Sequence, residues 1–325
     1  MNQLFLSISK PLVESSLHFL SIKYVTSIQA FKYLFLNTVF VGWGRKRSGK
    51  WSETMAKLFR KKFLLLEDGF IRSIGLGVEG SPSFSMVKDD TGIYYDATKS
   101  SKLEDILNDY DFDSDTHLME TAKKSKAKII EYKISKYNNF KSVDLSYLED
   151  ARPKVLIIAQ TAGDSSLEFG LGYHFTTQQM LDEAIQDNFE ATIYIKIHPD
   201  VLCGKKQSDI DLKKIPSSIH ILIDNINPIE LMGYFDKIYT KTSGMGFEAL
   251  LLGKEVHCYG MPFYAGWGVT EDKLLCDRRT KKLSVDEILA GAYILYSEYY
   301  NPYLNEKSDI LSVIEYIAED RKTNG

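Results

Sequence analysis

The sequence contains little cysteine, and the cysteines are not spaced as metal ligands. Cys203, Cys258 and Cys276 have no CxxC spacing and form no ligand set with the six histidines. Unpaired thiols of this kind are typical of a reducing compartment, and we therefore expect a cytoplasmic protein.

Long hydrophobic runs are also absent. No stretch of about eighteen uncharged apolar residues occurs, which argues against a transmembrane helix. The first positive charge comes only at Lys10 and no small-residue cleavage site follows, so a signal peptide is poorly supported. Residues 1–39 are nevertheless apolar and aromatic, and two interpretations stay open: a helical segment packed on its own domain, or a peripheral helix on the inner membrane surface. The side chains that would face lipid are Phe5, Phe19, Phe31, Tyr33 and Phe35.

Neither sign of charge dominates the chain. The 40 Lys and Arg residues against 44 Asp and Glu residues leave a formal net charge of -4, which argues against nucleic acid as the main partner. A length of 325 residues, of which 44% are hydrophobic, suffices for about two domains with large cores. The polar segment 151–153 precedes an apolar strand, and we therefore predict domains at 1–150 and 151–325.

The first half of the chain contains a glycine-rich turn that only partly matches a P-loop. A buried strand predicted at 38–44 runs into a basic turn at 45–50. Read from Gly44, the turn fits G-x-x-x-x-G-K, but Trp51 stands where a P-loop needs the Ser or Thr that ligates magnesium. The basic turn is instead expected to meet acidic lipid head groups or an anionic acceptor, or to be merely solvated.

Two adjacent carboxylates follow the next strand. After a helix predicted at 52–62 and a buried strand at 62–66 come Glu67 and Asp68, on a glycine loop that also carries Arg72. Burial between domains would raise the pKa of one carboxyl and suit it to general acid or base chemistry. The alternative is an exposed turn with an Asp–Arg ion pair. The elements predicted next are strands at 84–87 and 92–96, a hairpin turn at 89–92 that explains Asp89 and Asp90, and helices within 99–139.

The second half alternates strands and helices, which is typical of a parallel sheet. Polar clusters follow the strands, which would place Asp164, His198 and Ser243 on one rim of that sheet. A turn of small residues at 242–246 leads into a helix whose unpaired amides would bind a phosphate; the alternative is a tight connection without a ligand. The loop at 260–268 has aromatic residues that can pack a sugar or a base. Strands are predicted at 155–159, 191–197, 219–223, 238–240 and 255–259, and helices at 178–188, 228–235 and 247–252.

Several long motifs carry a family resemblance. They are EDGFIRS at 67–73, LGVEGSPSFSMVKDDTGIYYDAT at 76–98, QTAGD at 160–164, YIKIHPDVLCGKK at 194–206 and TSGMGFEALLLGKEVHCYGMPFYAGWG at 242–268. In them the chain resembles the capsule-polysaccharide β-Kdo transferases of the KpsC type, over nearly its whole length. The resemblance implies an α/β fold of two Rossmann-like lobes, GT-B-like, with the active site in the cleft between them. It also implies CMP-Kdo as the donor, on the C-terminal lobe, and a lipid-linked or Kdo-terminated glycan as the acceptor, on the N-terminal lobe.

The resemblance also implies roles for individual residues. Asp164, which ends the family's Q-x-x-x-D motif, would be the nucleophile that forms a Kdo-enzyme adduct, although its position also suits a helix N-cap. Glu67 would be the general acid/base that deprotonates the acceptor hydroxyl. The donor-binding set is His198, Pro199, Ser243, Gly244, Glu248, Lys196 and Gln160, with His198 and Ser243 at the CMP phosphate and Glu248 at the ribose. The sugar-binding set is Arg72, Ser73 and Asp68, with Arg72 near the Kdo carboxylate.

The chemistry of the implied reaction explains these residue types. The leaving group is a phosphate, which needs charge neutralisation more than a proton. Retention requires two displacements, so one carboxylate attacks the sugar and another serves the acceptor. No DxD-like pair follows a strand beside the CMP motifs, and we expect neither a catalytic metal nor another cofactor.

The chain departs from the resemblance in one respect. The best-known family proteins carry two transferase modules in tandem, whereas this chain has one, which leaves its linkage and its capsule-assembly partners open. Two other functions remain: a transferase for another CMP- or NDP-activated sugar, and a non-catalytic glycolipid- or polysaccharide-binding subunit. The non-catalytic alternative is disfavoured by the intact set of Glu67, Asp164, His198 and Ser243.

Overall fold

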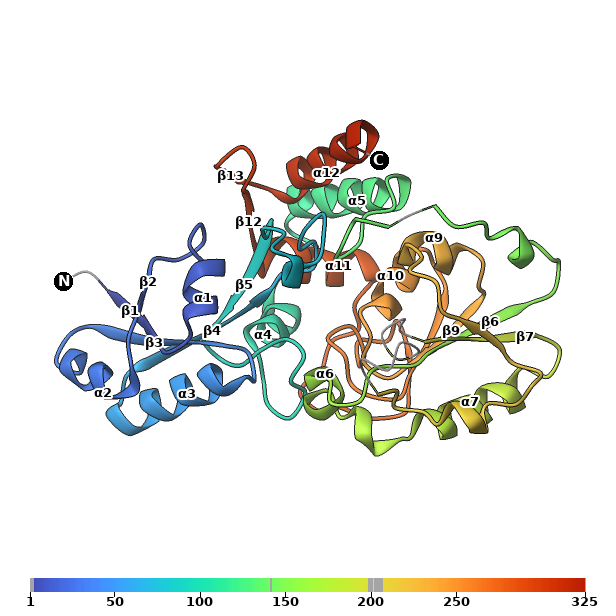
Figure 1. The fold of residues 1–325 in the computed structure, drawn as a ribbon, viewed down its shortest axis with the longest axis horizontal. Helices are drawn as coiled ribbons and strands as arrows, with labels where there is room; N and C mark the ends of the chain where they lie inside the picture. The colour runs from blue at the N-terminus through green and yellow to red at the C-terminus, as the bar shows by residue number, and fades with distance from the viewer. Residues whose placement is uncertain (1–2, 141, 198–200, 202–206, 325) are drawn as a thin grey trace.

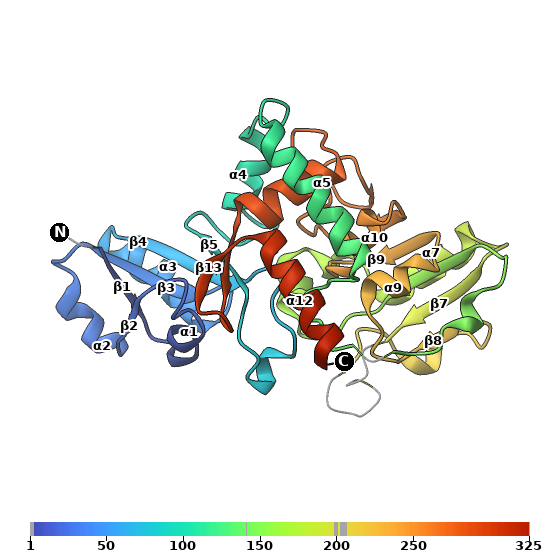
Figure 2. The same ribbon diagram turned by 90° about the horizontal axis from the view of Figure 1, so that it is seen from above.

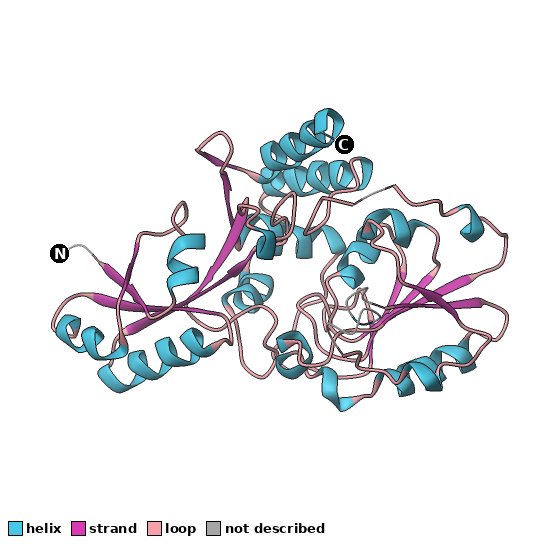
Figure 3. Ribbon diagram, in the orientation of Figure 1, coloured by secondary structure: helices cyan, strands magenta, loops and turns pink. Residues whose placement is uncertain are grey.

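Two β-sheets, one in each lobe, form the framework of the protein (Figure 1). The computed structural model describes residues 3–140, 142–197, 201 and 207–324. Helices lie on both faces of each sheet, and long loops fill the region where the lobes meet (Figure 3). The predicted α/β class with two Rossmann-like lobes is confirmed.

The first sheet has the strand order β13-β12-β5-β4-β3-β1-β2, and β1 to β4 are parallel. Its first strands are β1 (Leu4–Ser7), β2 (Ile22–Tyr24), β3 (Thr38–Trp43), β4 (Lys62–Asp68) and β5 (Ser85–Asp89). β1 lies between β2 and β3 with Leu6 fully buried, so the interpretation of residues 3–39 as a helical segment is wrong. Strands of three or four residues are too short for a periodic signal in the sequence.

The helices of the first lobe pack tightly against this sheet. They are α1 (Lys10–Ser15), α2 (Ser27–Ala30), the 3-10 helix η1 (Phe31–Tyr33) and α3 (Arg47–Phe59). A Cβ on Gly42 would overlap the backbone of Ser48, and one on Gly49 would overlap the Gly44 carbonyl group. These glycines are therefore required by the close packing of α3 on β3, and not by a phosphate loop.

The basic turn before α3 is only partly exposed. Arg45 is buried, and its guanidinium pairs with Glu53 at 2.8 Å and with Asp96. The predicted solvated or ligand-binding turn is therefore wrong for Arg45, whereas Lys46 and Arg47 are exposed. Arg45 is a structural residue that joins the loop after β3 to the loop after β5.

The second sheet is entirely parallel, with the strand order β11-β10-β9-β6-β7-β8. Its strands are β6 (Lys154–Ile158), β7 (Thr192–Lys196), β8 (His220–Leu222), β9 (Lys237–Thr240), β10 (Glu255–Cys258) and β11 (Glu271–Asp272). Its helices are α6 (Ser165–Phe169), α7 (Thr177–Asp187), α9 (Pro228–Gly233) and α10 (Met245–Leu251). The predicted strand and helix order is confirmed, with α6 and β11 as additions.

The end of the chain crosses back to the first lobe. β12 (Ser297–Asn301) pairs with β5 and with β13 (Glu306–Ser308), and α12 (Ile310–Asn324) packs beside α5 (Thr116–Glu131) (Figures 1 and 2). The predicted domain division therefore does not hold for residues 297–308, which belong to the first sheet. β12 also replaces the strand predicted at 92–96, where the chain forms turns. Partners so far apart in the sequence leave no local signal.

Further helices connect the lobes. They are α4 (Lys102–Asp109), α11 (Val285–Leu289) and the π-helix η6 (Ala290–Leu295), which follows α11 directly. Within the described residues, no helix is both long enough and apolar enough to span a bilayer.

Asp89, at the end of β5, ties the returning chain to the first lobe. Its buried carboxylate accepts hydrogen bonds from the amides of Thr91, Gly92 and Lys102 and from the hydroxyl of Tyr296. The turn chemistry predicted for Asp89 is therefore only part of its role. The same carboxylate also holds the start of α4 and the segment that leads into β12.

Asp89→Ala is expected to lower the free energy of unfolding by about 3 kcal/mol or more, because several buried donors lose their acceptor. Urea denaturation followed by circular dichroism measures this change. The exposed neighbour Asp90 provides the control, and Asp90→Ala should stay within about 0.5 kcal/mol of the wild type. Equal stabilities of the two variants would contradict the role given to Asp89.

Candidate active site

A cavity of about 790 Å³ lies between the two lobes. Residues at the carboxyl end of β4 in the first sheet line it on one side. Residues at the carboxyl ends of β6, β7 and β9 in the second sheet line it on the other. The chain leaves β6 toward β7 but leaves the adjacent β9 toward β10, so the two connections diverge. Such a switch point opens a crevice at the carboxyl edge of a parallel sheet, where ligands bind.

Gln160 joins the two strand ends at this crevice. Its side-chain oxygen accepts the Thr242 amide at 2.9 Å, and its side-chain nitrogen donates to the Thr242 hydroxyl at 3.0 Å. Its backbone N–H donates to Asp209 at 3.1 Å, and Asp209 pairs with the buried Lys241 at 3.3 Å. Gln160 therefore lines the cavity as predicted and also holds the loop after β6 against the loop after β9.

Asp164 stands on the exposed rim of the cavity, at the N-cap of α6. Its carboxylate accepts the Ser166 amide at 2.9 Å, which confirms the predicted cap. The loop that carries it is held by the Ala162 amide, which donates to the Gln207 carbonyl at 2.9 Å. The cap uses one carboxylate oxygen, Oδ1, of this exposed residue.

The turn before α10 presents Ser243 and Gly244 to the cavity. The Tyr264 hydroxyl donates to the Ser243 carbonyl at 2.6 Å, and a Cβ on Gly246 would overlap that hydroxyl. The three amides after Gly244 already donate to Ser243 or Gly244 within the turn. The helix start therefore offers fewer free donors to an anion than predicted, and side chains must supply more of the neutralising charge.

Glu67, at the end of β4, lies in the wall of the cavity. Burial raises the pKa of Glu67 to about 7 and the Asp68 carboxylate adds to the rise, while Lys136, Lys46 and a hydrogen bond from Trp43 oppose it. The indole N–H of Trp43 donates to Glu67 Oε1 at 2.6 Å. Both protonation states are therefore populated near neutral pH, as a general acid/base requires.

Glu248, on α10, is another carboxyl in the cavity wall, and it is buried, whereas Glu67 is half-buried. Burial raises the pKa of Glu248 to about 7, although a hydrogen bond from the Ser135 hydroxyl and the charge of Lys136 act against the shift. The Ser135 contact links α10 to the segment after α5.

Among the residues that the structure describes, three lysines line the cavity: Lys46, Lys136 and Lys196. Burial lowers the pKa of Lys196 to about 8, and the charge of Asp224 partly offsets this effect. The Lys196 ammonium also donates a hydrogen bond to the Asp224 carbonyl oxygen at 2.6 Å. For Lys136, burial acts to lower the pKa, but the surrounding phenols and carboxylates, Tyr94 foremost, raise it above its ordinary value. Lys136 therefore stays charged, and the cavity offers cations to an anionic ligand.

Sequence reasoning missed Lys136. The carbonyl of Lys136 accepts the Arg72 amide at 2.9 Å, and Tyr137 forms a parallel bridge with Ser73. This pairing brings the segment after α5 beside the end of β4. A single lysine after a helix belongs to no motif, so only the pairing of distant segments reveals it.

Aromatic side chains form another wall. Phe70 stacks on Tyr293 with ring centroids 4.7 Å apart, and it contacts Phe263 at 4.8 Å and Tyr94 at 5.0 Å. All four line the cavity. Flat apolar faces beside a few polar groups are typical of sugar and nucleotide sites, and Phe263 belongs to the loop predicted for that purpose.

The predicted sugar-binding residues lie beside this cavity. Arg72 and Asp68 line a neighbouring groove and pair at 3.2 Å, while the buried Ser73 hydroxyl donates to the Gly75 carbonyl at 2.5 Å. The Asp–Arg ion pair is confirmed, although its side chains are largely buried. His198 and Pro199 lie outside the described residues. The other predicted residues all line the cavity: Glu67, Asp164, Gln160, Lys196, Ser243, Gly244 and Glu248.

The cavity thus combines cations with carboxylates of different character. Lys136 and Lys196 can neutralise an anion, Glu67 can exchange a proton near neutral pH, and Asp164 presents an exposed carboxylate. In the described part of the chain, no group of three or more His, Cys, Asp or Glu side chains could hold a metal ion. The arrangement suits a transfer reaction in which the leaving group is an anion.

Two Rossmann-like lobes with a ligand cavity between them define the GT-B-like class of protein. The family described as "Capsule polysaccharide biosynthesis protein" matches residues 38–301, and the chain belongs to this family. "Capsule polysaccharide modification protein LipA" of Neisseria meningitidis serogroup B is 39% identical over 296 residues, which cover 87% of this chain and 42% of LipA. "Lipopolysaccharide-processing protein LpsZ" of Rhizobium meliloti is 35% identical over 257 residues, 79% of this chain and 58% of LpsZ. The chain thus spans about half the length of these curated relatives.

Two solved structures resemble the whole chain. "Thermosulfurimonas dismutans KpsC, beta Kdo 2,4 transferase" has a TM-score of 0.88 and 39% identity, covering 97% of this chain and 98% of that chain. "Thermosulfurimonas dismutans KpsC, beta Kdo 2,7 transferase" has a TM-score of 0.73 and 28% identity, covering 99% and 100%. These findings confirm the predicted family resemblance and the GT-B-like fold class.

The Trp43 indole should report the protonation of Glu67. In NMR spectra, its Nε1–H resonance is expected to titrate with a midpoint at about 7, because its acceptor is Glu67 Oε1. Glu67→Gln should abolish this titration. Lys136→Met should move the midpoint upward, because Lys136 lowers the pKa of Glu67. A Trp43 resonance that does not respond between about pH 5 and 9 would contradict the raised pKa.

Proposed function

We propose that the protein is a retaining β-Kdo glycosyltransferase, which transfers Kdo from CMP-Kdo to a lipid-linked or Kdo-terminated glycan in capsule or surface polysaccharide biosynthesis. One observation carries the proposal. A single cavity brings together Glu67, Asp164 and three lysines, in a chain that matches a Kdo transferase over 97% of its length.

The donor is held by charge. CMP-Kdo carries a phosphate and a carboxylate, and Lys46, Lys136 and Lys196 face this pair of anions. Ser243 and Gly244 lie against the phosphate, and Glu248 binds the ribose. His198 and Pro199, which lie outside the described residues, are proposed as phosphate ligands from the sequence resemblance alone. Gln160 keeps the two loops of this half of the site together.

The first displacement forms the adduct. A carboxylate oxygen of Asp164 bonds to the anomeric carbon of Kdo, the bond from that carbon to the phosphate oxygen breaks, and CMP leaves with the electron pair. The transition state is oxocarbenium-like, and fixed charges in the partly dry cavity stabilise the departing phosphate.

The second displacement transfers the sugar. An acceptor hydroxyl oxygen bonds to the anomeric carbon, its proton passes to the Glu67 carboxylate, and the bond to Asp164 breaks to restore its carboxylate. Two inversions give net retention. With a Glu67 pKa of about 7, the ionised form that accepts the proton gains population as the pH rises through neutrality.

A non-catalytic binding subunit is the other class of function. A site that only binds an acidic glycan has no use for two carboxyls withdrawn from water, because their ionised forms repel the ligand and their desolvation costs free energy. Glu67 and Glu248, each with a pKa of about 7, therefore favour the enzyme.

Asp164→Asn tests the activity and the nucleophile together. With CMP-Kdo and a synthetic Kdo-terminated acceptor, the wild type should release CMP and add one Kdo to the acceptor. Asp164→Asn should lose nearly all turnover, because an amide cannot replace the attacking carboxylate. Mass spectrometry detects both the product and a Kdo adduct on the peptide that contains Asp164. The adduct should accumulate in Glu67→Gln, in which the second displacement is slowed.

Asp211→Asn is the matched control. Asp211 caps the 3-10 helix Leu212–Lys214 by accepting the Lys213 amide at 3.1 Å, as Asp164 caps α6, but it lies outside the cavity lining. This variant should keep wild-type turnover. Substantial turnover in Asp164→Asn, or an adduct elsewhere, would refute the nucleophile. A folded wild type that uses another nucleotide sugar and not CMP-Kdo would favour the alternative transferase.

We also propose a peripheral contact with the inner membrane. Ile28, Phe31, Phe35 and Leu58 are 82%, 50%, 98% and 67% exposed. Phe31 packs on Phe59 with ring centroids 5.5 Å apart, so α2, η1 and the end of α3 form one surface. Exposed apolar side chains next to lysines suit an anionic bilayer. The lysines are Lys32, Lys57 and Lys61.

Sedimentation with vesicles tests this contact. Binding to anionic vesicles should weaken as salt rises, because exposed charges are screened over about 10 Å at 0.1 M salt. The double variant Phe31→Ser/Phe35→Ser should pellet less than the wild type, because apolar area is removed. Equal pelleting of the wild type with neutral and anionic vesicles would refute the electrostatic part of the contact.

A further inference from the structure

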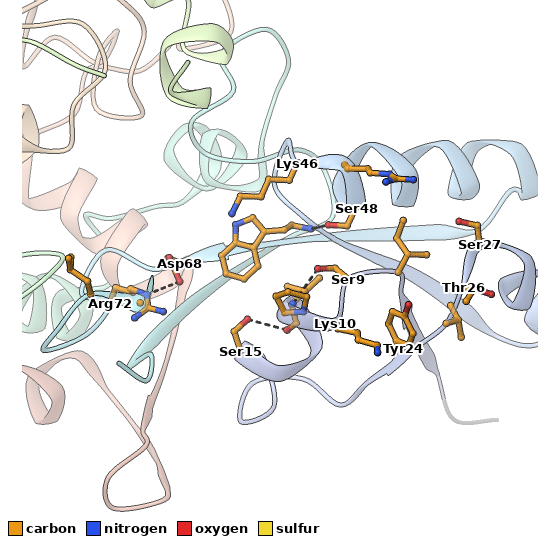
Figure 4. Close-up of a pocket in the computed structure, with 18 of the residues that line it drawn as sticks. Ser9, Lys10, Ser15, Tyr24, Thr26, Ser27, Lys46, Ser48, Asp68 and Arg72 are labelled. Carbon is orange, nitrogen blue, oxygen red and sulfur yellow. Dashed lines mark hydrogen bonds and ion pairs between the residues drawn. The ribbon is translucent and has the colours of Figure 1, made fainter. Parts of the chain in front are cut away.

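A second switch point lies in the first lobe. The chain leaves β1 toward β2 and leaves the adjacent β3 toward β4, and α1 and α3 cover opposite faces of the sheet (Figure 1). A groove of about 1010 Å³ opens at this carboxyl edge. The starts of α1, α2 and α3 all line it (Figure 4). The labelled residues from these starts are Ser9, Lys10, Thr26, Ser27, Lys46 and Ser48.

The groove is basic and rich in hydroxyl groups. Its cations are Lys10, Lys46, Arg47 and Arg72. Among the described lining residues Asp68 is the one carboxylate, and it is already paired with Arg72 at 3.2 Å. The start of α3 has no side-chain cap, so its dipole adds to the positive potential. Such a groove suits an anion that also carries hydroxyl groups.

Two of the cations stand over aromatic rings. Lys10 Nζ lies 5.3 Å from the centre of the Tyr24 ring, and Lys46 Nζ lies 4.9 Å from that of Trp43. An ammonium over an aromatic ring puts a charge for the carboxylate of a pyranose next to a flat apolar side chain. These pairs favour an acidic sugar over a small inorganic anion.

The groove adjoins the active-site cavity. Lys46, Leu76 and Tyr137 line both spaces. Trp43 lines the groove, and its indole N–H donates to Glu67 at 2.6 Å. A glycan in the groove would therefore point one end at the carboxyl group that exchanges a proton.

We propose that this groove is the acceptor site and binds a carboxylate-bearing sugar of an acidic oligosaccharide, with Lys10 and Arg47 as its specificity-determining contacts. The acceptor hydroxyl then lies toward Glu67, while the rest of the chain lies along the carboxyl edge of β1 and β3. The place of this site in a reaction rests on the proposed function, but the binding of an acidic sugar can be measured without any turnover.

Calorimetry on the full chain tests the groove. The probes are a β-linked Kdo disaccharide and the same disaccharide with its carboxyl groups reduced to alcohols. The wild type should bind the acidic form at least about tenfold more tightly, because the reduced form loses charge-assisted contacts. Lys10→Glu/Arg47→Glu should weaken binding of the acidic form about tenfold or more and raise the KM for the acceptor, with the donor KM unaffected.

Lys123→Glu/Lys124→Glu is the matched control. It changes the net charge equally, on exposed residues of α5 outside the groove lining, and should bind the acidic disaccharide as the wild type does. Circular dichroism checks that each variant folds. Lys10→Ala/Arg47→Ala, expected to weaken binding in the same direction, replaces the charge reversal if that variant does not fold.

The outcomes separate this proposal from the proposed function. Wild-type affinity and acceptor KM in a folded groove variant would overturn the groove while leaving Kdo transfer intact. Equal binding of the acidic and reduced disaccharides, or displacement of the acidic form by an equal concentration of glycerol 3-phosphate, would overturn the choice of an acidic sugar. Binding that depends on Lys10 and Arg47 in a protein that transfers no Kdo would support the groove and overturn the proposed function.

Discussion

The hydrogen bonds of the Gln160 side chain are the contacts on which the site depends. At a switch point two neighbouring strands send their chains to opposite faces of the sheet, so the loops above them tend to separate. Gln160 bonds both the amide and the hydroxyl of Thr242, and so joins the loop of Asp164 to the turn of Ser243. A buried amide with its partners satisfied is costly to break, and the spacing of the two loops is therefore well defined.

The chemistry of the cavity depends equally on the approach of the first lobe. Burial is the largest influence on Glu67 and Glu248, and it exists because the loops of both lobes exclude water from one space. The charge of Lys136 limits the rise of both pKa values, so each stays at about 7. The returning strand β12, held through Tyr296 and Asp89, keeps the end of the chain on the first sheet while η6 contributes Tyr293 to the cavity.

The two lobes use one architectural rule twice. Each parallel sheet has a switch point, at β6 and β9 in the second lobe and at β1 and β3 in the first, and a cavity or groove opens at each. Trp43 connects them, because its ring lines the groove while its indole N–H holds Glu67. The groove and Glu67 thus share one side chain.

The sequence by itself determined the parts of this protein that are local. Apolar runs and small-residue turns predicted the second sheet and its polar rim, and long motifs predicted the family and most of the cavity residues, Glu67, Asp164 and Ser243 among them. The tertiary structure decided what depends on distant pairing: the strands β1 and β2, the return of β12 to β5, and the place of Lys136 beside Glu67. It also placed Arg72 in the wall of the groove and not in that of the cavity. The physical reason is that periodicity and turn chemistry act over a few residues, whereas strand pairing, burial and charge coupling arise only when the folded chain brings separate segments together.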